Sequence, residues 1–120
     1  MPVVDVCWVG GLPPDGDAFA SRLADVLGDA LQLAPGRVWV RLQPLPAEQY
    51  AENGGPLQGA LPIFVTLLHA RPPSGPALAA EVAALTAAMA RVSGRPADRV
   101  HLEYAPAGAG RLAFGGRLVG

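Results

Sequence analysis

The second residue of the chain is a proline, and at this position a proline can do chemistry that an internal proline cannot. MPVVDVCW opens the sequence, with Pro2 directly before a strand-like run. Inside a chain the proline nitrogen is an amide without an N–H, and it is not a base. Once Met1 is removed, the ring nitrogen of Pro2 is a free secondary amine that can take up and release a proton. The alternative is a harmless proline at a strand edge, where the missing N–H is tolerated.

A free prolyl amine suits proton transfer near neutral pH. An α-amino group has a pKa of about 7.7–8.0, and both an apolar pocket and a nearby arginine lower that pKa by disfavouring the charged form. A base poised in this range suits proton transfer at a carbon beside a carbonyl. Pro62 begins a similar run later in the chain, but its nitrogen is an amide. We therefore expect one such site in each chain.

Further polar and aromatic side chains lie in two short strand-like runs. GRVWVRLQP contains Trp39 and Arg41, and DRVHLEYAP contains His101 and Glu103. Alternate residues of a strand share a face, so the members of each pair point the same way. Glu103 is either a second acid/base group or the ion-pair partner of an arginine, and we favour the ion pair.

The composition excludes several kinds of chemistry. All nine basic residues other than histidine are arginine, so a lysine Schiff base is excluded. The single cysteine, Cys7, rules out an internal disulfide framework. His69, His101 and Cys7 lack metal-ligand spacing, and the glycines lack a phosphate-loop pattern. We predict neither a metal nor a cofactor.

Charge and hydropathy restrict the partners. The net charge is −1, with no basic or acidic run, so nothing indicates nucleic acid or an anionic membrane. We find neither a signal peptide nor an apolar run of about 18–20 residues, and we expect a cytoplasmic protein. Hydrophobic residues make up 51% of the chain and charged residues 16%, which is apolar for a small monomer. We expect an oligomer.

An internal repeat organises the elements that must position these residues. PVVDVCWVGG matches PIFVTLLHAR, GRVWVRLQP matches DRVHLEYAP, and YAENGG matches RLAFGG, in the same order and at a nearly constant offset. The sequence predicts one domain over residues 1–120, with repeats over about 2–58 and 62–120.

Helical patterns lie between the matched strands. Each shows apolar residues at helical spacing, namely Phe19, Leu23, Val26, Leu27, Ala30 and Leu31 in the first half and Leu78, Val82, Leu85, Met89 and Val92 in the second. Asp15 or Asp17 is expected to cap the first helix and Ser74 the second, with Pro76 in its first turn and Gly94 at its exit.

Each half therefore reads as strand, helix and strand, followed by a Gly-Gly turn. Such units form parallel strand pairs with right-handed crossovers. We predict an α+β fold in which two β-α-β units form one four-stranded mixed sheet with both helices on one face. The other face is also apolar, and association of subunits is its simplest cover. The same element order also describes ferredoxin-like ligand-binding modules, whose strands pair into an antiparallel sheet.

The whole layout resembles the tautomerase superfamily, which includes 4-oxalocrotonate tautomerase, macrophage migration inhibitory factor, malonate semialdehyde decarboxylase and cis-3-chloroacrylic acid dehalogenase. The resemblance rests on Pro2, the β-α-β duplication, IFVTLLHARPPSG (63–75), PADRVHLEY (96–104) and LAFGGR (112–117), and it covers nearly the whole chain. It implies a homotrimer in which an N-terminal proline acts as catalytic base or acid.

The resemblance also implies roles for other residues. Arg71 matches an arginine that binds the substrate carboxylate, which a guanidinium can grip with two hydrogen bonds. His101 aligns with a position that contacts the substrate, although it could also be a strand histidine satisfied by a neighbour. Trp39, its counterpart in the first half, is expected at an interface, and Arg41 could offer a second cation to a neighbouring subunit.

Aromatic residues before the Gly-Gly turns often form a pocket wall in this family. Tyr50 and Phe114 occupy these places, where they could equally be packing anchors. The second arginine of the dehalogenase and the decarboxylase is absent, because Pro73 and Ser74 stand there. The water-activating glutamate of the dehalogenase is replaced by Ala113.

These departures make hydration chemistry less favoured and leave the simplest reaction of the family. We expect keto–enol proton transfer on a small 2-hydroxy-alkenoate or related 2-oxo acid, with Pro2 as base and Arg71 on the carboxylate. The alternatives are a hydratase, dehalogenase or decarboxylase of the same family, or a trimeric relative without catalysis.

Overall fold

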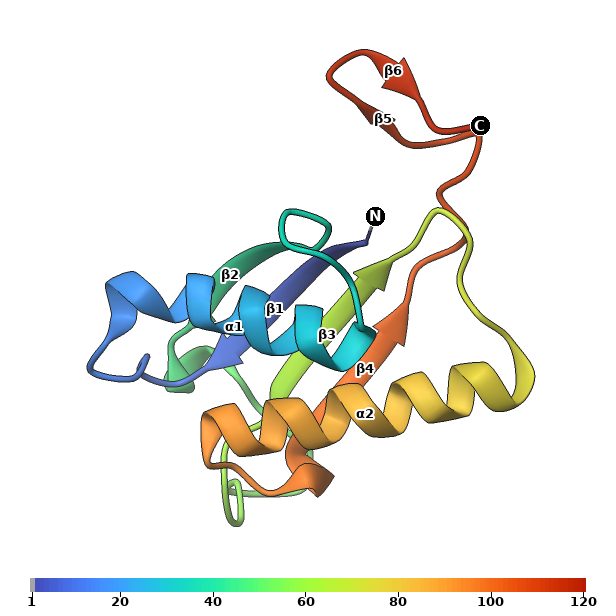
Figure 1. The fold of residues 1–120 in the computed structure, drawn as a ribbon. Coiled ribbons are helices and arrows are strands. Elements are labelled where there is room, and N and C mark those ends of the chain that lie inside the picture. The colour runs from blue at the N-terminus through green and yellow to red at the C-terminus, as the bar shows by residue number, and fades with distance from the viewer. Residues whose placement is uncertain (1) are drawn as a thin grey trace.

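The computed structural model describes residues 2–120, which form four main strands, two long helices and a small hairpin. In chain order the elements are β1 (Val3–Val9), α1 (Gly16–Leu31), β2 (Trp39–Leu45), η1 (Ala47–Gln49), β3 (Ile63–Leu68), α2 (Gly75–Ser93), η2 (Ala97–Arg99), β4 (Val100–Tyr104), β5 (Ala113–Phe114) and β6 (Arg117–Leu118). Both long helices lie on the same face of the main sheet (Figure 1).

Strand pairing follows the two halves of the sequence. The four-stranded sheet has the order β2-β1-β3-β4; β1 is parallel to β2, β3 is parallel to β4, and the central strands β1 and β3 are antiparallel. The predicted mixed sheet with two β-α-β units is confirmed. The ferredoxin-like alternative is wrong, because each helix connects two strands that are parallel neighbours.

The helices begin and end largely where the sequence indicates, but their caps differ from the expectation. Asp15 occupies the N-cap of α1 without a side-chain capping bond, because its carboxylate pairs with Arg22 at 3.3 Å. Ser74 at the N-cap of α2 also makes no side-chain cap. Gly94 ends α2 in the left-handed conformation, as predicted, whereas Gln32 takes this conformation at the end of α1 (φ 57°).

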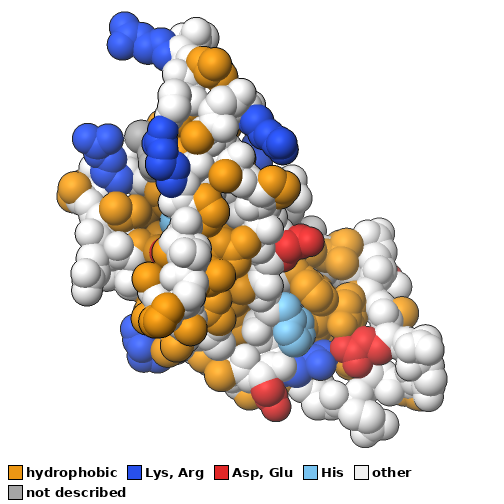
Figure 2. Space-filling model, turned by 90° about the vertical axis from the view of Figure 1, so that its right-hand side faces the viewer, with side chains coloured by type: hydrophobic (Ala, Val, Ile, Leu, Met, Phe, Trp, Pro, Cys, Tyr) orange, Lys and Arg blue, Asp and Glu red, His pale blue; other side chains and the backbone are white. Residues whose placement is uncertain are grey.

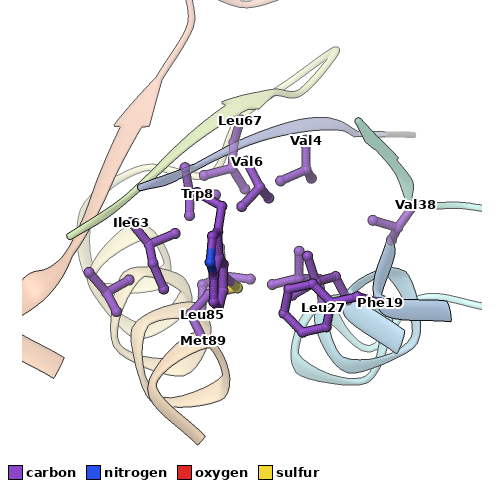
Figure 3. Packing of buried hydrophobic residues seen from close by; sticks show 13 residues of the cluster. Val4, Val6, Trp8, Phe19, Leu27, Val38, Ile63, Leu67, Leu85 and Met89 are labelled. Atoms are coloured by element: carbon purple, nitrogen blue, oxygen red, sulfur yellow. The ribbon is translucent and has the colours of Figure 1, made fainter. Parts of the chain in front are cut away.

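The core lies between the sheet and the two helices (Figure 3). Trp8 from β1 is its largest member; its ring meets Phe19 of α1 edge-on at 4.9 Å between centroids, and its indole N–H donates to Gly11 O at 3.0 Å. The guanidinium of Arg95 covers the Trp8 ring at 4.3 Å. Leu85 and Met89 of α2 complete this layer. The core fixes both helices on one face and leaves the other face of the sheet open.

The open face carries most of the side chains that the sequence singled out. Alternation along the strands directs to it Val3, Asp5 and Cys7 from β1, Trp39, Arg41 and Gln43 from β2, Phe64 and Thr66 from β3, and His101 and Glu103 from β4. Trp39 and Phe64 are 44% and 38% exposed there. Large apolar side chains on one uncovered sheet face are typical of a surface that is buried in an assembly.

By length and composition alone, α2 could also cross a membrane, in contrast to the expectation from the sequence. The helix packs Leu85, Ala88 and Met89 against the sheet, where all three are fully buried. The core helix of a globular domain has the same composition, so this feature is weak evidence for a membrane.

The strand register aligns the two halves of the chain with a shift of one residue from the sequence repeat, in which Pro2 matches Pro62. Val3 pairs with Trp39, and Phe64 pairs with His101, both on the open face. Val3 therefore corresponds to Phe64, and Pro2 corresponds to Ile63 rather than to Pro62.

Candidate active site

Pro2 lies at one end of the sheet, directly before the central strand β1. It is buried, and its carbonyl accepts the backbone N–H of Trp39 at 3.2 Å. Val3 pairs with Leu68, so the chain leaves β3 at the same end. Met1, whose removal the base role requires, lies outside the described residues. The antiparallel pairing of β1 and β3 thus brings the Pro2 end of the chain to the segment that carries Arg71.

Arg71 follows β3 in the connection to α2, and it is exposed. Its guanidinium donates a hydrogen bond to the carbonyl of Gly120. The backbone before it is fixed by the C-terminal segment, because His69 O accepts the N–H of Gly108 at 2.8 Å and Ala70 O accepts that of Ala109 at 3.0 Å. Arg71 is therefore placed by two parts of the chain that are distant in sequence.

Two aromatic residues lie beside this end of the sheet. The rings of Trp39 and Phe114 meet edge-on, with centroids 4.7 Å apart. Phe114 lies in β5, and Gly115 and Gly116 make the turn into β6, both with positive φ. The β5–β6 hairpin projects from the sheet near the N-terminus (Figure 1). Because the N–H of Trp39 binds Pro2 O, the aromatic pair stands close to the start of β1.

This end is also basic. Arg71, Arg111 and Arg117 are exposed, and none of them makes an ion pair within residues 2–120. Figure 2 shows blue side chains around the end with the hairpin, hydrophobic atoms over the middle, and a mixture of acidic, basic and histidine side chains at the opposite end. Such a basic end favours an anionic substrate and the neutral form of a nearby amine.

Tyr50 and His101 lie at the opposite end of the sheet. Both flank Phe64 at the start of β3, with ring centroids 5.9 Å and 5.3 Å from its own. The Tyr50 hydroxyl donates to Glu52 at 2.5 Å, and Arg99 binds the same carboxylate at 3.0 Å. The hydrogen bond to Glu52 raises the pKa of Tyr50, and the bonds from Tyr50 and Arg99 lower the pKa of Glu52.

Arg41 and Glu103 lie between these ends, on opposite edge strands of the open face. Arg41 grips Asp5 with two hydrogen bonds of 2.6 and 2.9 Å, and this bond to Asp5 raises the pKa of the guanidinium. Glu103 makes no ion pair with an arginine in the part of the chain that the structure describes. Arg41 is therefore already paired within its own chain, whereas Glu103 has no arginine partner among residues 2–120.

Sequence reasoning missed one cluster altogether. His69, Glu81 and Tyr104 meet between the end of β3, α2 and the end of β4, near the segment that carries Arg71. Burial, followed by the hydrogen bond to Glu81, raises the pKa of Tyr104. No local pattern signals a contact among residues so distant in sequence.

Among residues 2–120 no three His, Cys, Asp or Glu side chains are grouped as metal ligands would be.

A single chain thus divides the candidate residues into two halves, which lie at opposite ends of its sheet. One half contains Pro2, Arg71, Trp39 and Phe114, which supply a terminal proline, a cation and an aromatic wall. The other contains Tyr50 and His101, which supply hydroxyl and imidazole groups. Within one chain, the length of the sheet separates these halves.

Solved structures share this fold over nearly the whole chain. A protein called Pt0534, inactivated by 2-oxo-3-pentynoate, has a TM-score of 0.77 at 17% identity, covering 98% of this chain and 94% of its own. A fused 4-OT symmetric trimer has a TM-score of 0.74 at 19% identity, with coverage of 98% and 94%. A macrophage migration inhibitory factor homologue from Prochlorococcus marinus has a TM-score of 0.72 at 16% identity, with coverage of 98% and 99%.

The resemblance to the tautomerase superfamily is confirmed at the level of the fold. No model of a known protein family matches the sequence. No curated protein matches it either.

Proposed function

Starting from a chain with the tautomerase fold, we propose that it is an isomerase that catalyses keto–enol proton transfer on a small 2-hydroxy-alkenoate or related 2-oxo acid. The observation that carries this proposal is that Pro2 and the segment with Arg71 lie at the same basic end of the sheet, because Val3 pairs with Leu68. A proton-transfer base and a carboxylate-binding cation are the two groups that this reaction requires.

The proton transfer uses only the groups of this chain and the substrate. With Met1 removed, the neutral amine of Pro2 takes the proton of the enol hydroxyl as the C=O bond forms. The electron pair of the C=C bond then takes a proton from the prolinium at carbon, which regenerates the neutral amine. Nothing is oxidised or reduced, and the substrate is isomerised.

Arg71 and its surroundings support this reaction electrostatically. A guanidinium can hold the substrate carboxylate with two hydrogen bonds and fix the enol relative to the base. The burial of Pro2 and the positive charge of Arg71, Arg111 and Arg117 at this end of the molecule both favour the neutral amine. The base is thereby kept in its reactive form near neutral pH.

The remaining candidate residues act in an assembly. We propose a cytoplasmic homotrimer in which Tyr50 and His101 of one subunit face the Pro2 end of the next, across the open faces. The fused 4-OT with the same fold is a symmetric trimer. Trp39 and Phe114 would form the wall of the pocket, and Arg41 and Glu103 would lie at its subunit boundary.

The first test is enzymatic. Intact mass establishes that Met1 is removed, and ultraviolet absorbance then follows ketonisation of phenylenolpyruvate and 2-hydroxymuconate. We expect a rate above that of the buffer reaction for at least one substrate, and a loss of about 10²–10⁴-fold in Pro2→Ala, as for removal of a general base.

Pro62→Ala is the matched control, because it makes the same change where the nitrogen is an amide. We expect it to keep the wild-type rate. Wild-type protein with a free Pro2 that accelerates neither substrate would contradict the proposal and would favour a relative without this chemistry. Full activity in Pro2→Ala would contradict the mechanism.

A further inference from the structure

A polar cluster behind the candidate site has no part in the proton transfer. The Glu81 carboxylate accepts the hydroxyl of Tyr104 at 2.6 Å and lies 2.9 Å from Nε2 of His69. The rings of His69 and Tyr104 stack at 12°, with centroids 5.9 Å apart. The side chains of His69 and Glu81 are only 12% and 16% exposed. The cluster joins α2 to the ends of β3 and β4.

Glu81 is an unusual residue for its helix. It is the only acidic residue of α2, which otherwise consists mainly of alanine and other apolar residues on the sheet side. Moving a carboxylate out of water is costly, and its hydrogen bonds offset that cost without making the group a net source of stability. A partly buried carboxylate with two partners fixes the directions of those partners more than it adds to folding.

The partner that matters for the site is His69, because it stands two residues before Arg71. Its ring is held by Glu81 on one side, and its carbonyl is held by the N–H of Gly108 on the other. An added Cβ at Gly108 would lie 3.3 Å from His69 O, so the two backbones are in close contact. The chain before Arg71 is therefore fastened both to α2 and to the C-terminal segment.

We propose that His69, Glu81 and Tyr104 form a positioning network that fixes residues 69–71 and thereby the direction of the Arg71 guanidinium. The inference rests on the proposed function in that Arg71 binds a substrate carboxylate. The three residues are positioning residues, since they touch one another and the backbone beside Arg71 rather than the substrate.

Amide hydrogen exchange tests the structural half of this inference without any substrate. Glu81→Ala removes both hydrogen bonds of the carboxylate. We expect exchange at the Gly108 and Ala109 amides to rise by about tenfold or more, because their acceptors lie in the segment that is released. Thr86→Val is the control, since it removes a hydroxyl bound to Val82 O within the same helix. Exchange at these amides that is equal in Glu81→Ala and wild type would overturn the proposal.

Discrimination between an acid and its ester tests the catalytic half. Phenylenolpyruvate and its methyl ester differ in the group that Arg71 would hold. We expect the ratio of kcat/KM for the acid to that for the ester to fall roughly tenfold in Glu81→Ala, since small misplacements of a binding group are costly. Tyr104→Phe, which removes one hydroxyl, should give a smaller fall, and Glu81→Gln, which keeps an acceptor for Tyr104, should restore part of the ratio.

If the network only stabilised the fold, Glu81→Ala would lower kcat/KM for the acid and for the ester by the same factor. An unchanged ratio would therefore overturn the positioning role. Arg71→Ala separates the two proposals. If it abolishes the preference for the acid while the Glu81 variants retain it, only the network is refuted. If Arg71→Ala has no effect on the preference, the proposed function of Arg71 is refuted. The double variant should lose no more of the ratio than Arg71→Ala alone.

Discussion

After Pro2, Arg71 is the residue on which the proposed chemistry most depends. Arg71→Ala should lower kcat/KM for an enol acid by roughly 10–100-fold, the cost of losing a charge-assisted hydrogen bond of about 1.5–3 kcal/mol. Steady-state kinetics with phenylenolpyruvate measures this. Arg91→Ala, at the far end of α2, is the control and should be close to wild type.

The same substitution should move the pH profile. Pro2 reacts as the neutral amine, so kcat/KM rises as the pH increases through the pKa of the amine. A positive guanidinium nearby lowers that pKa, and its removal in Arg71→Ala should shift the rising limb to higher pH. If kcat/KM of Arg71→Ala rises at the same pH as in the wild type, Arg71 does not lower the pKa of the Pro2 amine.

The two tyrosines allow a spectroscopic prediction at the same scale. The hydrogen bond to Glu52 raises the pKa of Tyr50, because ionisation would lose the bond and place two anions together. Burial, followed by the hydrogen bond to Glu81, raises the pKa of Tyr104. The chain has no other tyrosine. The ultraviolet absorbance of tyrosinate should therefore rise only at pH values above about 10, the ordinary pKa of a tyrosine. Glu52→Gln should lower the pKa of Tyr50 and leave that of Tyr104 unchanged. An unchanged titration curve would contradict the hydrogen bond between Tyr50 and Glu52.

At the scale of elements, the two helices end in the same conformation with different residues. Gln32 is left-handed at the end of α1, and Gly94 is left-handed at the end of α2. This conformation strains any residue with a Cβ, so Gln32→Gly should raise the free energy of unfolding by about 0.5–1 kcal/mol. Gly94→Ala should lower it by about 1 kcal/mol. Thermal unfolding measures both changes, and two shifts of the same sign would contradict this explanation.

The elements themselves were predictable because their signals are local. Apolar spacing located both helices, and the alternation of Trp39 with Arg41 and of His101 with Glu103 placed each pair on one face. Asp15 makes no capping bond, because Arg22 competes for its carboxylate. Ser74 makes none either, and nothing in the structure explains it. The cluster around Glu81 could not be predicted, because its partners come from three elements whose packing no local pattern encodes.

The candidate residues could be named from the sequence, but their division between the two ends of the sheet could not. The structure brings Pro2, Arg71, Trp39 and Phe114 to one end of the sheet, and it leaves Tyr50 and His101 at the other. A resemblance to a family suggests candidate residues without saying which of them lie together in one chain. The strand register supplied that information, through the pairs Val3–Leu68 and Phe64–His101.

At the scale of the whole molecule, this division predicts complementation between inactive variants. Pro2→Ala retains an intact His101 half, and a His101→Ala chain retains an intact Pro2 half. When the two are unfolded, mixed in equal amounts and refolded together, random association in a closed ring should restore roughly a quarter of the sites. Each variant refolded alone is the control.

The sedimentation of the protein tests the same arrangement. A homotrimer that buries the open faces should have three times the mass of the chain and should dissociate together with its activity upon dilution. A fully active monomer would contradict a site shared between subunits, and so would mixed variants that gain no activity.

The bonds from Gly108 and Ala109 to the residues before Arg71 have a consequence for synthesis on the ribosome. The segment that fixes Arg71 and the Phe114 ring beside Trp39 follow Pro2 by about a hundred residues, and they are therefore synthesised after it. Until those residues emerge, a nascent chain can already have lost Met1 and still have no finished pocket. Under the proposed function, the free amine would therefore exist before the groups that direct it to a substrate, for as long as translation of the remaining residues takes.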